Sequence, residues 1–401
     1  MNILEKLGFS CVDFVSPQEL QKKLDSGKKL RVKLGADPTS TDLHLGHAVA
    51  LAKMRAFQDM GHTGVLVIGD FTASIGDPSG RDTTRPVLTR ERIEANAETY
   101  KKQAFKILDE SKTEVRFNSE WLGGFAGAGG REGGLLSTLS RVTVARLLER
   151  EDFQNRMKEG SPISMLEMLY PVFQGYDSVA LKSDVELGGK DQLFNLLVGR
   201  DLQRDAGQEA QIVMTMPLLP GTDGVRKMSK SYGNYVGIID EPQQMFGKLM
   251  SIPDTLMWEY YAVLGPELLR LGEQAAAETE AAKKLHPMEA KKRLAALVVE
   301  RLHGRAQAEE ARAGFEKVFS KREYPQDMPV FTPVPGQRLS QLLVAAGLAP
   351  GMNESRRLIK QGGVRIDGEK IADDFVPDLK DAMVLQVGSR RFCKISLGAA
   401  K

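Results

Sequence analysis

Cysteine and long apolar runs are both scarce in this 401-residue sequence. Its two cysteines, Cys11 and Cys393, do not form a C-x-x-C pair. We therefore expect neither a zinc site nor a thiol redox motif, and no other metal site built from side chains. Low cysteine use is typical of proteins that live in a reducing cytoplasm.

No stretch approaches the roughly 20 apolar residues that a membrane span requires, and the opening MNILEKLGFS lacks the apolar core of a secretory signal. We therefore expect a cytoplasmic protein without a membrane partner. Apolar residues make up 42% and charged residues 27% of the chain, as in ordinary globular proteins. The length predicts two to four domains.

The formal net charge is only +2, yet basic residues gather near the C-terminus. They include Arg338, Arg356, Arg357, Lys360, Arg365, Lys370, Arg390, Arg391 and Lys394. A basic tail on a near-neutral chain indicates a polyanionic partner.

The first half of the chain has the pattern of a β-α-β unit. Residues 29–36 read as a strand, 44–60 as a helix stopped by Gly61, and 64–70 as a buried parallel strand. Further helices are predicted over 94–110, 135–157 and 164–181, with strands near 115–117 and at 210–216. The glycine-rich segment 123–134 is expected to be a loop.

Three changes in composition along the chain mark the predicted domain boundaries. Residues 1–240 form the first predicted domain, with an insertion at about 119–165, and residues 241–320 are almost wholly helical in period. Residues 321–337 carry four prolines and read as a linker. Residues 338–401 form a compact basic unit.

The tetrapeptide His44-Leu45-Gly46-His47 opens the predicted helix 44–60. Residues three apart share one helix face, and a helix N-terminus attracts phosphate. Gly46 lets a sugar or base approach the backbone, and Thr41 and Asp42 are candidates to cap the helix. The alternative is a pair of surface histidines, and H-x-G-H also occurs in small nucleotidyltransferases.

A second motif, Lys227-Met228-Ser229-Lys230-Ser231, follows a turn-forming run at 221–224. Two cations in a glycine-bounded loop can close over a triphosphate, whereas a lone K-x-x-K is more often a solvated basic loop. The two motifs together resemble the signatures of class I aminoacyl-tRNA synthetases. The resemblance implies an α/β fold: a doubly wound parallel-sheet nucleotide-binding catalytic domain with a helical insertion, then an α-helical domain and a small α+β RNA-binding domain.

The segment 170–177, YPVFQGYD, resembles the substrate helix of tyrosyl-tRNA synthetases. The resemblance implies that Tyr170 and Gln174 hold the α-ammonium of tyrosine and that Asp177 accepts a hydrogen bond from the phenol. The three lie at i, i+4 and i+7, on one helix face; a polar stripe on an amphipathic helix is the alternative. A site built around such an acceptor rejects phenylalanine by roughly 10⁴–10⁵.

Other roles are also implied by the resemblance. Asp77 binds the ammonium, with Asp37 and Thr72 in the same tyrosine site, and Gln192 binds the substrate carboxylate. Asp191 holds the ribose, in a loop that tryptophanyl enzymes share. The remaining residues expected at ATP are Gly35, Gly46, Gly189, Met228 and Ser229.

The sequence departs from well-known tyrosyl enzymes at three positions. Lys33 stands where they place a tyrosine that donates to the phenol, and Leu34 replaces a small polar residue at the ribose. Glu186 replaces a frequent glutamine, and its role stays open.

The resemblance implies two steps: tyrosine attacks ATP to give tyrosyl-adenylate and pyrophosphate, and the tRNA(Tyr) terminus then takes the tyrosine. Thr39, His44, Lys227 and Lys230 would contact the β/γ-phosphates, and His47 with Gly46 the ribose and base. Positioning and cations, rather than a general base, would supply catalysis. Magnesium is expected to enter with ATP, with no tightly bound cofactor and with a homodimer as the assembly.

The C-terminal unit resembles a small RNA-binding domain that many bacterial tyrosyl enzymes share with a ribosomal protein. Arg356, Arg357 and Lys360 would share a helix face and meet RNA phosphates, although a solvated face is the alternative. The helical segment 241–320 is the expected anticodon partner, and the insertion near 135–165 is the expected dimer interface. The rival functions are a tryptophanyl-tRNA synthetase, a non-catalytic RNA-binding relative and a small nucleotidyltransferase.

Overall fold

A computed structural model of the chain describes residues 3–77, 89–125, 134–320, 328–334, 336–388 and 391–397. The contacts within the chain divide it into two compact units, Met1–Glu309 and Glu310–Lys401. Parts of two predicted segments lie outside the described residues: most of the glycine-rich segment 123–134, and residues 321–327 and 335 of the proline-bearing segment 321–337. The basic residue Arg390 lies outside them too.

The first unit is built on a six-stranded sheet in the order β1-β6-β5-β2-β3-β4. Only the edge pair β1–β6 is antiparallel. The strands are β1 Asp13–Val15, β2 Arg31–Ala36, β3 Thr63–Ile68, β4 Thr113–Phe117, β5 Val185–Gly189 and β6 Ile212–Met216. The doubly wound parallel sheet expected from the resemblance is thereby confirmed.

The chain reverses its direction of winding between β2 and β5. From β2 it proceeds through β3 to β4 on one side, whereas β5 and β6 lie on the other. In open α/β sheets, ligands bind outside the carboxyl ends of the strands at such a switch point. The sheet therefore singles out the ends of β2 and β5, near Asp37 and Gly189, as the place for a site.

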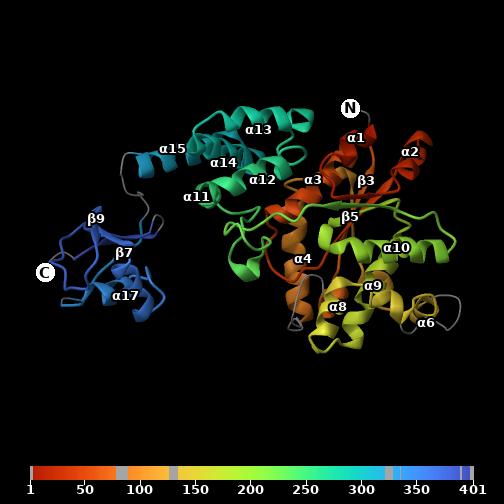
Figure 1. Ribbon diagram of the computed structural model, residues 1–401, viewed down its shortest axis with the longest axis horizontal. Coiled ribbons are helices and arrows are strands. Elements are labelled where there is room, and N and C mark those ends of the chain that lie inside the picture. Colours follow the sequence, from red (N-terminus) through yellow and green to blue (C-terminus); the bar gives the residue numbers. More distant parts are fainter. Residues whose placement is uncertain are drawn as a thin grey trace. The chain divides into compact units, whose positions relative to one another are not determined.

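Helices cover both faces of this sheet (Figure 1). Helix α3, Leu45–Asp59, packs on β2, β3 and β5, while α9, Met165–Leu181, lies along α10, Leu193–Asp205. The other helices before β6 are α1 Ile3–Gly8, α2 Pro17–Asp25, η1 Thr72–Ser74, α4 Arg90–Ala104, η2 Glu110–Lys112, α5 Ser119–Leu122, α6 Leu135–Leu139, α7 Val144–Leu147, α8 Glu151–Lys158 and η3 Lys190–Gln192.

One predicted helix was wrong in extent: the segment 94–110 ends as α4 at Ala104. The segment predicted as helical over 135–157 contains three short helices, α6, α7 and α8. Thr143 caps α7 by accepting a hydrogen bond from the Arg146 backbone N–H, so the chain starts a new helix there. By contrast, α9 matches its predicted span, because a Ser164–Glu167 capping box defines its start.

The helical segment after β6 agrees with its predicted periodicity. It contains η4 Lys230–Tyr232, α11 Pro242–Met250, α12 Asp254–Leu264, η5 Gly272–Gln274, α13 Ala275–Lys283, α14 Pro287–His303 and α15 Arg305–Ser320. Tyr261 is fully buried here, and its hydroxyl donates to the Ala290 carbonyl at 2.8 Å, which joins α12 to α14.

The second unit contains a mixed sheet in the order β7-β11-β10-β8-β9 with two helices. Its elements are β7 Val330–Phe331, α16 Leu339–Ala345, α17 Met352–Lys360, β8 Val364–Ile366, β9 Glu369–Ile371, β10 Val384–Val387 and β11 Arg391–Ile395. Leu342, Leu343 and Ile359 from the helices pack with Leu385 and Ile395 from the sheet to form its own core. Within the described residues, no helix is long and apolar enough to cross a membrane.

Candidate active site

A cavity of about 550 Å³ opens at the switch point of the parallel sheet. All eighteen residues that the sequence assigned to tyrosine, ATP and catalysis line it. They are Gly35, Asp37, Thr39, His44, Gly46, His47, Thr72, Asp77, Tyr170, Gln174, Asp177, Gly189, Asp191, Gln192, Lys227, Met228, Ser229 and Lys230. The fold thus brings together residues that are separated by almost two hundred positions in sequence.

Two histidines stand at the start of α3. His44 is the N-cap of the helix: its Nδ1 accepts from the Gly46 N–H, and its own N–H donates to Nδ1 of His47, both at 3.2 Å. The suggestion that Thr41 or Asp42 caps this helix was therefore wrong. Because both Nδ1 atoms accept, each neutral ring carries its proton on Nε2, where it can donate to a ligand.

Burial keeps both imidazoles neutral. It lowers the pKa of His44 to about 2, aided by His47 and Lys227, and the pKa of His47 to about 4. The rings lie 3.9 Å apart, and both border the open cavity. These histidines can therefore serve phosphate or hydroxyl groups as hydrogen-bond donors, without contributing positive charge.

The positive charge at this end comes from the loop after β6. Lys227 Nζ lies 3.0 Å from Asp191 Oδ2, and Lys230 Nζ lies 2.7 Å from Asp42 Oδ2. Asn234 fixes the loop between them, since its side chain accepts from the Ser229 N–H at 2.8 Å and donates to the Lys227 carbonyl. Lysine, histidine and a helix N-terminus together form a site suited to a polyphosphate.

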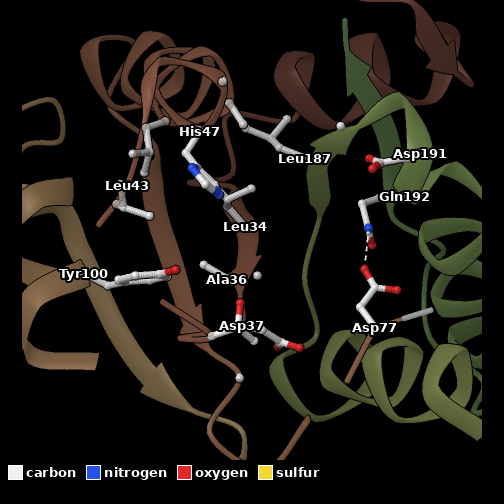
Figure 2. A pocket seen from close by; sticks show the side chains of 18 of the residues that line it. Leu34, Ala36, Asp37, Leu43, His47, Asp77, Tyr100, Leu187, Asp191 and Gln192 are labelled. Carbon is white, nitrogen blue, oxygen red and sulfur yellow. Dashed lines mark hydrogen bonds between the residues drawn. The ribbon is translucent and has the colours of Figure 1, made fainter. Parts of the chain in front are cut away.

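The opposite end of the cavity is acidic. Asp37 accepts from the Tyr170 hydroxyl and from the Thr72 hydroxyl, each at 2.8 Å. Gln192 donates to Asp77 at 2.7 Å across the cavity (Figure 2). Burial and three carboxylates, those of Asp37, Asp77 and Asp177, raise the pKa of Tyr170 well above its usual value. Such a group of carboxylates suits a ligand that carries an ammonium group.

Asp177 lies deep at this acidic end and is almost fully buried. The indole N–H of Trp121 donates to its Oδ1 at 2.8 Å. Burial raises the pKa of Asp177 to about 7, although Lys33 and the Trp121 hydrogen bond act to lower it. A buried carboxylate with capacity left on its oxygens can accept a hydrogen bond from a hydroxyl group of a ligand.

Two glycines permit these close approaches. A Cβ on Gly69 would lie 2.0 Å from Asp37 Oδ1 and 2.4 Å from Thr72 Oγ1. A Cβ on Gly46 would lie 3.0 Å from the His44 ring. The loop after β3 and the first turn of α3 therefore depend on the missing side chains.

Three further polar residues of the site were not predicted from the sequence. Asn195 donates to the side-chain oxygens of Gln174 and Gln192, at 2.9 and 3.1 Å. Asn118 donates to Thr72 Oγ1 at 3.0 Å, and Trp121 contacts Asp177. Asn118 directly follows β4, so its place at the carboxyl end of a parallel strand was the signal that could have identified it.

The three residues that depart from well-known tyrosyl enzymes, Lys33, Leu34 and Glu186, lie in two different environments. Leu34 lies beside His47 in the cavity (Figure 2). Lys33 does not line the cavity, and it pairs with Glu186 below α9. Among the described residues, no group of three or more His, Cys, Asp or Glu side chains is placed to hold a metal ion.

Comparisons with known proteins agree with this geometry. The family model described as tRNA synthetases class I (W and Y) matches residues 25–320, and the S4 domain model matches residues 337–373. The chain is 52% identical to the tyrosine–tRNA ligase of Thermotoga maritima over 98% of this chain and 96% of that protein. It is 49% identical to the tyrosine–tRNA ligase of Aquifex aeolicus over 96% of each.

Solved structures share the fold. The tyrosyl-tRNA synthetase of Archaeoglobus fulgidus, complexed with L-tyrosine, matches with a TM-score of 0.60 and 21% identity, covering 77% of this chain and 98% of that one. The tryptophanyl-tRNA synthetase of Plasmodium falciparum matches with a TM-score of 0.56 and 16% identity, over 77% and 87%.

Proposed function

The chain belongs to the class I tRNA synthetases of the tryptophan and tyrosine group and acts as a tyrosine–tRNA ligase, and we propose that the cavity holds tyrosine at its acidic end and ATP at its histidine end. The observation that carries this assignment is the depth of Asp177 at the acidic end. Relatives at about half identity are tyrosine enzymes, which disfavours the tryptophanyl and non-catalytic alternatives.

Tyrosine would enter with its phenol toward Asp177. Asp77, Tyr170 and Gln174 would bind its ammonium group, with Asp37 and Thr72 orienting the Tyr170 hydroxyl. Asn195 restrains the side chains of Gln174 and Gln192, and Gln192 would hold the substrate carboxylate. The site would thus fix three parts of the amino acid, and phenylalanine would leave the buried Asp177 without its partner.

The ribose and base of ATP would lie over Gly46, His47 and Asp191, near Gly35, Gly189 and Met228. Its β/γ-phosphates would lie near Thr39, His44, Lys227, Ser229 and Lys230. Lys227 and Lys230 now pair with Asp191 and Asp42. Binding of the triphosphate would draw both lysines from these carboxylates, and Asp191 would be released to accept from the ribose. Mg²⁺ would arrive with the phosphates and neutralise part of their charge.

In the first step a carboxylate oxygen of tyrosine attacks the α-phosphorus in line, and the bond to pyrophosphate breaks. The carboxylate is already anionic, so no general base is required. The His44 N–H group and the two lysines would stabilise the charge that develops on the phosphates, while His47 would contact the ribose. In the second step a ribose hydroxyl at the tRNA terminus attacks the acyl carbon, and AMP leaves.

The second unit supplies the proposed tRNA contact outside the cavity. Three basic residues are exposed on α17, inside the segment that matches the S4 model: Arg356, Arg357 and Lys360. Their positive charge would meet RNA phosphates, while the helical segment 241–320 would contact the anticodon arm. A protein that acts on tRNA, with both of its cysteines free, fits a cytoplasmic location.

We also propose a homodimer through the inserted helices. Large apolar side chains are exposed there: Leu136 at 72%, Met165 at 69% and Val144 at 58%. Brought together in one patch, such apolar groups would mark an interaction surface. The double variant Leu136→Glu, Met165→Glu should run as a monomer in light scattering after size exclusion, with Val225→Glu, a still more exposed apolar position elsewhere, as the control.

The test of the function is amino-acid-dependent ATP–pyrophosphate exchange, with tyrosine, phenylalanine and tryptophan offered separately. Exchange with tyrosine alone is the expected result. Exchange with tryptophan would overturn the substrate assignment, and folded protein without exchange for any of the three would overturn the enzymatic assignment.

A further inference from the structure

A row of residues crosses the central strands on the face opposite His47. Lys33 of β2 and Glu186 of β5 are register partners, flanked by Val65 of β3 and Val213 of β6. All four side chains are buried. Lys33 Nζ lies 2.8 Å from Glu186 Oε1, so an ion pair occupies the middle of an otherwise apolar row.

The ion pair is attached to the underside of α9. Lys33 Nζ donates to the backbone carbonyl of Gln174 at 3.1 Å and to Ser178 Oγ at 2.9 Å. Ser178 Oγ in turn donates to Glu186 Oε2 at 2.9 Å, and Gln211 Nε2 donates to the same oxygen. Lys33 therefore spans the helical turn from Gln174 to Ser178, which also carries Asp177.

Stability alone does not account for this arrangement. Removing two charges from water costs more than their attraction usually returns, and apolar side chains of similar size often pack there as well or better. Valines already fill the neighbouring positions of the row. The pair instead lies where it contacts the one helical turn that presents two proposed tyrosine ligands.

We infer that Lys33 is a specificity-determining positioning residue for tyrosine: it fixes the turn of α9 that carries Gln174 and Asp177. This inference rests on the proposed function. The carboxylate form of Asp177 has only acceptor sites to offer, which is what the hydroxyl of tyrosine requires and what phenylalanine cannot use.

The charges around Asp177 predict the direction in which each substitution should shift its pKa. Burial raises the pKa of Asp177, Lys33 lowers it, and Glu186 raises it. The other titratable groups at the acidic end are Tyr170, which lies on the same helix as Asp177, and the carboxylates of Asp37 and Asp77. The two members of the ion pair therefore act on Asp177 in opposite directions, whereas a purely structural pair would act through folding alone.

The experiment is tyrosine-dependent ATP–pyrophosphate exchange from pH 5 to 9 on the full chain, with kcat/KM plotted against pH. Activity should fall on the acid side as Asp177 becomes protonated. Lys33→Met should move this acid limb to higher pH and Glu186→Gln to lower pH, each by roughly one pH unit. At pH 7 Lys33→Met should also reduce the preference for tyrosine over phenylalanine by at least about tenfold.

Lys53→Met is the matched control. Lys53 is equally buried and pairs with Glu267, but its ammonium group bonds to the Leu7 carbonyl rather than to α9. Its loss should lower the midpoint of thermal unfolding and leave the acid limb in place. The double variant Lys33→Met, Glu186→Gln removes both charges and should place the limb between those of the single variants.

Shifts of the same sign in both single variants, or no shift in either, would overturn the inference while leaving the function intact. If Lys33→Met does not fold, Glu186→Gln decides the question by itself: a limb at lower pH supports the inference and an unmoved limb refutes it. Wild-type protein without tyrosine-dependent exchange would remove the proposed function, and with it this inference.

Discussion

The ammonium group of Lys230 lies 2.7 Å from a carboxylate oxygen of Asp42 and 2.6 Å from the Thr41 hydroxyl. Asp42 precedes α3, and Lys230 follows β6, so this contact joins the loop of the second motif to the entrance of the first. Lys227 makes a similar contact with Asp191. Both lysines are thus held at the cavity by single carboxylates, which a triphosphate of higher charge can displace.

Lys230→Ala should lower the rate of tyrosyl-adenylate formation by roughly 10²–10³-fold, since it removes a cation aimed at the developing charge. The affinity for tyrosine should change little, because Lys230 lies at the histidine end. Single-turnover quench kinetics would measure both. Lys248→Ala is the control, because Lys248 is similarly exposed, pairs with Asp240 and does not line the cavity. An unchanged activation rate in Lys230→Ala would refute the assigned role.

Asp42→Asn tests the ion pair that holds Lys230 at the cavity. It keeps the shape of the side chain but weakens its hold on Lys230, so the KM for ATP should fall. Both groups are partly exposed, so the effect should be no more than about fivefold. Steady-state exchange at varied ATP would measure it. A KM that rises instead would mean that Asp42 assists nucleotide binding.

Asp177→Asn should abolish most of the selection for tyrosine. The amide oxygen can still accept from Trp121, so the helix should remain in place, but the charged acceptor for the phenol is lost. The ratio of kcat/KM for tyrosine to that for phenylalanine should fall by at least about 100-fold, within the roughly 10⁴–10⁵ that such a site provides. Trp121→Phe should give a smaller loss, because it removes only a supporting donor.

Much of this site could be predicted from the sequence, because its residues occur in two short motifs and on one helix face. His44, His47, Lys227 and Lys230 are recognisable because the two motifs resemble those of class I synthetases. Tyr170, Gln174 and Asp177 are recognisable because their segment resembles the substrate helix of tyrosyl enzymes. Asn195 and Trp121 were missed, since each acts through a tertiary contact that no local pattern encodes. The partnership of Lys33 with Glu186 depends on strand register, and 153 positions separate them in the chain.

The protonation of the two histidines makes a prediction about pH. Burial lowers the pKa of His44 to about 2 and that of His47 to about 4 in the folded state, against 6.5 without it. As pH falls, the unfolded chain therefore binds protons before the folded protein does. The stability that the two histidines contribute is complete above about pH 6.5 and is lost as pH falls toward their folded-state pKa values. Nitrogen-detected NMR should find both rings neutral, with the proton on Nε2, from pH 8 to pH 5. Titration of either ring near pH 6.5 would contradict the buried, uncharged arrangement.

Arg356 and Lys360 separate tRNA binding from amino-acid activation. Both are exposed on α17 in the second unit, whereas Arg357 already bonds to Glu354. Arg356→Ala with Lys360→Ala should raise the KM for tRNA(Tyr) in aminoacylation by roughly tenfold and reduce the slope of log affinity against log salt by about two. Tyrosine-dependent ATP–pyrophosphate exchange should stay unchanged, because the cavity lies wholly in the first unit. Arg357→Ala, as the matched charge removal, should have the smaller effect, since the Arg357 guanidinium is already bonded to Glu354 and is less available to a phosphate. An unaltered salt dependence in the double variant would mean that this helix face does not contact RNA.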